Sequence, residues 1–107
     1  MSDDLRGTVV PLANCIDYQE GSVVSRTIIK KDTGTVTVFA FDKDQGLSEH
    51  TAPFDALVHI VEGKAEITIS GESQVAAAGE MIIMPANQPH AVKATEKFKM
   101  LLVMIRS

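Results

Sequence analysis

The stretch from Gly46 to His90 constrains the fold most, because it consists of short apolar or alternating runs that each end at a turn signal. The runs cover residues 57–61, 64–70 and 81–84. Runs of about four to eight residues bounded by glycine, proline or polar residues are typical of β-strands. All three histidines of the chain, His50, His59 and His90, lie within this stretch. The stretch therefore predicts a series of β-strands with histidines among them.

The rest of the chain follows the same pattern. Residues 23–29 are rich in β-branched side chains, residues 35–41 alternate in polarity, and residues 98–105 form a final apolar run. The alanine-rich residues 75–78 end at Gly79 and are too few to form a stable helix. Many short strands separated by turns predict an all-β protein, built as an antiparallel sandwich or barrel.

The length of 107 residues fits one domain. We expect residues 1–20 to form an irregular N-terminal segment with a possible edge strand at Val9, Val10 and Leu12, because proline, here Pro11, is tolerated at sheet edges. Residues 21–107 are expected to form the barrel.

Composition limits the classes of partner. The net charge is −4 and tryptophan is absent, so neither nucleic acid nor an anionic membrane surface is an expected partner. Cys15 is the single cysteine, so no disulfide can form within the chain. The polar, acidic start lacks the pattern of a signal peptide. These features predict a cytoplasmic protein.

Several residues in the central stretch match the motifs of a known family. Gly79, Pro85 and His90 have the spacing of the second cupin motif, and Gly63 suits the closing glycine of the first motif. His50 then occupies the position of the first motif histidine. The chain therefore resembles the cupins over about residues 36–105. The resemblance implies an antiparallel jelly-roll β-barrel with a site in its lumen.

The chain also departs from these motifs. Ala52 stands at the position of the second histidine, Ala56 at that of the glutamate, and Ala94 at that of the final asparagine. Two of the four metal-ligand positions thus remain, His50 and His90. The resemblance implies a divalent transition metal as cofactor (iron, zinc, manganese or nickel), with isomerase or dioxygenase chemistry by analogy.

A metal held by protein usually needs about three protein ligands, so a third ligand is required. His59 is one candidate, and Glu49, Asp55 and water are others. Alternation of side chains along a strand argues that His59 faces outward if Ala56 faces the lumen. A bulge near Pro53 would reverse that direction.

The walls of the lumen are predicted from the same positions. We expect the pocket to be lined by Ala52, Phe54, Ala56, Met84 and Met100. Methionines in this part of the chain have two interpretations. Their thioethers either line a pocket for apolar ligands or soft metals, or they fill the core.

Both faces of residues 57–61 and 101–105 are apolar, whereas a lone barrel needs only its inner face buried. This surplus predicts a homodimer formed by packing of sheets.

Two classes of function remain open. The first is a metal-dependent or metal-assisted enzyme acting on a small molecule, or one in which His50 and His90 serve as general acid and base without metal. The second is a non-catalytic module that binds or senses a small-molecule ligand with a degenerate metal site. Whether the protein is an enzyme is not decided by its sequence.

Overall fold

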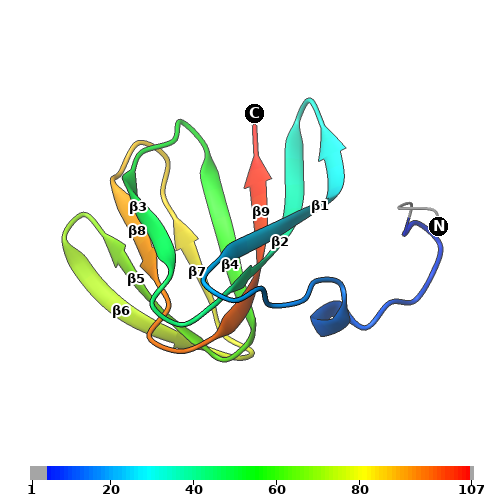
Figure 1. Ribbon diagram of the computed structural model, residues 1–107. Coiled ribbons are helices and arrows are strands. Elements are labelled where there is room, and N and C mark those ends of the chain that lie inside the picture. The colour runs from blue at the N-terminus through cyan, green and yellow to red at the C-terminus, as the bar shows by residue number, and fades with distance from the viewer. Residues whose placement is uncertain (1–4, 107) are drawn as a thin grey trace.

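The computed structural model describes residues 5–106, which form two antiparallel sheets packed as a jelly roll (Figure 1). The five-stranded sheet has the order β1-β2-β9-β4-β7, and the four-stranded sheet has the order β3-β8-β5-β6. The strands are β1 (Val23–Lys31), β2 (Gly34–Phe41), β3 (Gly46–His50), β4 (Asp55–Glu62), β5 (Lys64–Ile69), β6 (Glu72–Ala77), β7 (Met81–Met84), β8 (His90–Lys93) and β9 (Phe98–Ile105). The predicted all-β fold is confirmed. None of the helical segments in residues 5–106 has the length and apolar character needed to cross a membrane.

The core fills the space between the two sheets, which we call the lumen. Phe41 of β2 and Phe98 of β9 are fully buried there, and their rings stack with centroids 4.4 Å apart. Val58 and Ile60 of β4 face the same space, and Ile67 reaches it from β5 in the opposite sheet. Every second residue of these strands therefore points into the core, because side chains alternate between the two faces of a strand.

The turn between β4 and β5 depends on Gly63. Its φ of +74° lies in the left-handed region, where side chains are disfavoured. A Cβ at this position would also overlap the carbonyl oxygen of Lys97 and lie 2.9 Å from Cβ of Phe98. Glycine is thus needed for the close passage of this turn beside the start of β9.

The N-terminal segment packs against the outside of the five-stranded sheet. The possible edge strand at Val9 and Val10 does not form. Instead the 3₁₀ turn η1 (Leu12–Asn14) follows Pro11, whose carbonyl accepts a hydrogen bond from the Asn14 amide at 3.0 Å. Side chains of this segment pack with Val38 and Ala40 of β2 in a second apolar cluster. Burial against the outer face thus replaces pairing at a sheet edge.

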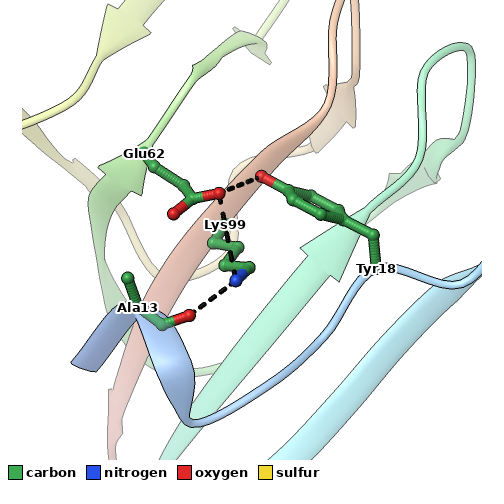
Figure 2. A network of polar contacts seen from close by, with 4 residues as sticks. All are labelled: Ala13, Tyr18, Glu62 and Lys99. Atoms are coloured by element: carbon green, nitrogen blue, oxygen red, sulfur yellow. Dashed lines mark hydrogen bonds and ion pairs between the residues drawn. The ribbon is translucent and has the colours of Figure 1, made fainter. Parts of the chain in front are cut away.

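A polar network fixes this segment in place (Figure 2). The Lys99 ammonium, on a side chain only 8% exposed, donates to the carbonyl of Ala13 at 2.5 Å and lies 3.9 Å from the Glu62 carboxylate. The Tyr18 hydroxyl donates to that carboxylate at 2.6 Å. Burial, and then the hydrogen bond to Glu62, raises the pKa of Tyr18. The network joins the segment to β4 and β9, and no sequence motif predicts it.

Candidate functional site

His50 and His90 meet in the lumen from neighbouring strands of the four-stranded sheet. They are direct cross-strand partners in the pairing of β3 with β8. Their rings meet edge to face with centroids 4.3 Å apart, and the two Nε2 atoms are 3.0 Å apart. His90 is buried at 4% exposure, whereas His50 is exposed. The pair thus runs from the surface into the barrel.

Backbone carbonyls orient both rings. Nδ1 of His50 lies 2.8 Å from the carbonyl oxygen of Ser48, and Nδ1 of His90 lies 3.1 Å from that of Gln88. A carbonyl oxygen only accepts, so each Nδ1 is assigned a proton. Each neutral ring then presents a lone pair at Nε2, and two lone pairs 3.0 Å apart attract only if a cation or a proton lies between them. The geometry therefore suits a cation bound between the two Nε2 atoms.

The environment of His90 disfavours a proton on its ring. Burial lowers the pKa of His90, and the neighbouring His50 lowers it further, while the hydrogen bond to the Gln88 carbonyl opposes both. A proton on His90 would place a positive charge in the buried interior of the barrel. The folded protein therefore keeps His90 neutral at pH values just below 6.5, at which an exposed histidine would be charged.

The lowered pKa of His90 predicts a pH dependence of stability for the metal-free protein. The unfolded chain binds a proton near the ordinary value of 6.5, and the folded chain binds it only at lower pH. The stability contributed by neutral His90 is therefore complete above that value and is lost as the pH falls through the lowered folded pKa. We expect the free energy of unfolding, measured by urea denaturation, to fall more steeply for wild type than for His90→Gln as the pH is lowered from about 7.5 to 5. The same dependence of unfolding free energy on pH in both proteins would contradict the lowered pKa of His90.

The pair borders a small cavity of about 50 Å³. An engineered apolar cavity that binds benzene has a volume of roughly 150 Å³, so this smaller one has room for an ion or a water molecule and not for an aromatic substrate. Its lining residues come from both sheets and are Leu47, His50, Ala52, Ala56, Met84, His90, Val92, Met100, Leu102 and Met104. Among the described residues, the two imidazoles are its titratable groups, and no carboxylate lines it.

The structure places most of the expected wall residues in this cavity. Ala52, Ala56, Met84 and Met100 line it together with the two histidines. Phe54 does not line it and lies beside Arg106 instead, whose guanidinium carbon is 5.4 Å from the ring centre. The chain between β3 and β4 is a bend and not a strand. Strand alternation therefore does not apply there, and Phe54 need not face the same way as Ala52.

Met104 was missing from the expected walls although it lines the cavity. It lies on the same face of β9 as Met100 and Leu102, and this shared face follows from their spacing of two. The signal was therefore present in the sequence. The structure was needed only to show which methionines line the same cavity as the histidines.

None of the expected protein candidates for a third ligand joins the pair. His59 follows Val58, which is fully buried in the lumen, and lies on the outer face of β4 opposite Met81 and Leu101. Asp55 is exposed and accepts a hydrogen bond from the Ala86 amide at 2.9 Å. Glu49 is exposed as well.

The two imidazoles form the donor set that the lumen offers to a metal ion. Two imidazole nitrogens converge and fit one ion. Within residues 5–106, however, no three histidine, cysteine, aspartate or glutamate side chains gather as a metal site would require. The site therefore fits a metal that takes two nitrogen ligands from this set, and not one that needs three.

A family model described as the cupin domain matches residues 37–106. The chain belongs to the cupin family. The match covers the strands that carry both motifs and agrees with the resemblance seen in the sequence. A comparison with curated proteins found no match.

Solved structures place this cupin among close relatives. A conserved protein of unknown function from Streptococcus pyogenes is 38% identical with a TM-score of 0.93, over 99% of this chain and 93% of that one. A cupin superfamily protein from Desulfitobacterium hafniense is 25% identical with a TM-score of 0.92, over 99% and 97% of the two chains. A cupin 2 conserved barrel domain protein from Leptotrichia buccalis is 39% identical with a TM-score of 0.85, over 88% of this chain and 46% of that longer chain. These likenesses establish family and fold.

Proposed function

We propose that this cupin binds a single metal ion in its lumen through Nε2 of His50 and Nε2 of His90. The observation that carries the proposal is the 3.0 Å approach of the two Nε2 atoms while both Nδ1 atoms face backbone carbonyls. Imidazole nitrogens bind transition metals at about 2.0–2.1 Å, so one ion can contact both. Holding the remote nitrogen of a ligand ring by a hydrogen bond is the usual way that proteins orient metal-binding histidines.

A bound metal with open positions would act as a Lewis acid toward a small molecule. In this chain His90 would hold the ion from inside the barrel, and exposed His50 would border the entry for a ligand. The apolar walls would exclude water from that position. Metal-assisted chemistry of the isomerase or dioxygenase type is the enzymatic form of this proposal.

A titration tests the metal site itself. Metal-free protein titrated with Zn²⁺ or Ni²⁺ in a calorimeter is expected to bind one ion per protomer. The double variant His50→Ala/His90→Ala is expected to bind none, and His59→Ala, which removes the histidine on the outer face, is expected to bind as wild type does. Absence of binding by wild type to every metal tried, or equal binding by the double variant, would overturn the proposal.

A non-catalytic binding or sensing module is the second candidate. The degenerate donor set favours it, since no group of three metal-ligating side chains gathers among the described residues to support metal catalysis. The two functions differ in the effect of His50→Ala. In an enzyme the variant abolishes a reaction, whereas in a binding module it only weakens the binding of a ligand.

We also propose that the barrel forms a homodimer through the outer face of β4, β7 and β9. This face carries Met81, Ile83 and Ile105, which are 58%, 51% and 60% exposed. The N-terminal segment covers the neighbouring part of the same sheet over β2. The open part is mostly apolar, with His59 beside Met81, so a second copy of it is complementary in chemistry, and a two-fold axis would pair the face with itself.

The dimer is tested by placing a charge on this face. Ile83→Lys is expected to shift the protein from dimer to monomer in sedimentation velocity, because a buried unpaired ammonium opposes association. Val75→Lys is the matched control, since Val75 is 60% exposed on β6 of the other sheet. A monomeric wild type, or equal behaviour of both variants, would contradict this interface.

A further inference from the structure

Two methionines flank Ala56 on the wall of the lumen opposite the histidines. Ala56 of β4 is the cross-strand partner of Met84 on β7 and also of Met104 on β9. Directly opposed residues on one face of a sheet have Cβ atoms about 4.5–5.5 Å apart. The two thioether side chains thus stand on either side of a small alanine that leaves space between them.

The methionine pair and the histidine pair border the same cavity. Met84 and Met104 belong to the five-stranded sheet, whereas His50 and His90 belong to the four-stranded sheet. Sheets that pack face to face lie about 10 Å apart, a gap that long side chains from both walls fill together. Met84 is 5% exposed, so its thioether has little access to solvent. Two nitrogen donors and two sulfur donors therefore border a space the size of an ion.

The charge of this cavity selects among ions. No carboxylate from residues 5–106 lines it, so no side chain there would neutralise the charge of a bound cation. The cost of burying an ion grows with the square of its charge, so a divalent ion costs about four times as much as a monovalent one. The cavity thus favours a monovalent ion.

The chemistry of the donors selects as well. Thioether sulfur is a soft ligand that favours Cu(I), while magnesium, calcium and manganese favour oxygen ligands. Neutral imidazole also binds copper. Softness and charge therefore point to the same ion.

We propose that the metal of the lumen is Cu(I), bound by the imidazoles of His50 and His90 and by thioether sulfur of Met84 and Met104. This inference rests on the proposed function, because it names the ion for the same two histidines. The methionines are ligands in this account, and in the simpler account they only fill the core.

The test compares Cu(I) and Zn²⁺ binding under anaerobic, reducing conditions. Cu(I) affinity is measured by competition with a chromophoric Cu(I) chelator, and Zn²⁺ affinity by calorimetry. Met84→Leu/Met104→Leu keeps the volume and apolar character of the walls and removes both sulfurs. We expect it to weaken Cu(I) binding roughly tenfold or more and to leave Zn²⁺ binding unchanged. Met81→Leu, on the outer face of the same strand as Met84, is expected to bind both ions as wild type does.

X-ray absorption of the Cu(I)-loaded protein gives a second readout, in which copper–sulfur scattering is expected for wild type and not for the leucine variant. Cu(I) binding that is equal in both proteins, without sulfur scattering, would overturn the thioether ligands and leave the two-histidine site standing. Tighter binding of Zn²⁺ than of Cu(I) by wild type would also overturn the inference. Failure of wild type to bind any of these ions would overturn the inference and the proposed function together.

Discussion

Ala52→His is expected to raise the affinity of the barrel for Zn²⁺ by about 100-fold or more, because it adds a third imidazole to the pair. Ala52 lines the same cavity as His50 and His90 and occupies the position of the second histidine in the first cupin motif. Three protein ligands with an open position are the usual set of a catalytic zinc site. The measurement is Zn²⁺ affinity by calorimetry or by competition with a chelator.

Ala91→His is the matched control for this gain of binding. Ala91 is the neighbour of His90 on β8, so strand alternation places its side chain on the face away from the lumen. We expect this variant to keep the Zn²⁺ affinity of wild type. Equal gains in both variants would show that any added surface histidine is enough, and no gain in Ala52→His would show that Ala52 does not face the metal.

Phe98→Ala is expected to lower the free energy of unfolding by about 3–5 kcal/mol, the largest stability effect that we predict. The Phe98 ring is fully buried and stacks on Phe41. Its removal loses the transfer free energy of the ring and leaves a void that the rigid sheets fill only in part. Urea denaturation followed by circular dichroism measures the change.

The control for this prediction is Phe54→Ala. Phe54 is half-buried, lies outside the core clusters and borders Arg106. Its truncation is expected to cost about 1 kcal/mol. A cost for Phe98→Ala no larger than that of Phe54→Ala would contradict the placement of Phe98 at the centre of the core.

The fold could be predicted because its signals are local. Strands β7 and β9 begin and end where their apolar runs do, at Met81–Met84 and Phe98–Ile105. Glycines and prolines between the runs marked the turns. The N-terminal segment departed from expectation because its conformation is set by packing against Val38 and Ala40, which are distant in sequence.

The site could be predicted only where strand alternation holds. Alternation gave the outward direction of His59, since it follows Val58 directly on a regular strand. It failed for Phe54, which lies in the bend before β4. The meeting of His50 with His90 followed from the family motifs. The pairing of Ala56 with both Met84 and Met104 depends instead on strand register, which the sequence does not state.

The central claim is that His50 and His90 hold a metal ion in the lumen. The most direct measurement is the metal content per protomer, by elemental analysis for copper, zinc, iron, manganese and nickel, of tag-free protein purified anaerobically without chelator. The account predicts close to one ion per protomer in wild type and in His59→Ala, and its loss in His50→Ala/His90→Ala. A wild type that carries no more metal than the double variant, even after incubation with each of these ions, would contradict it.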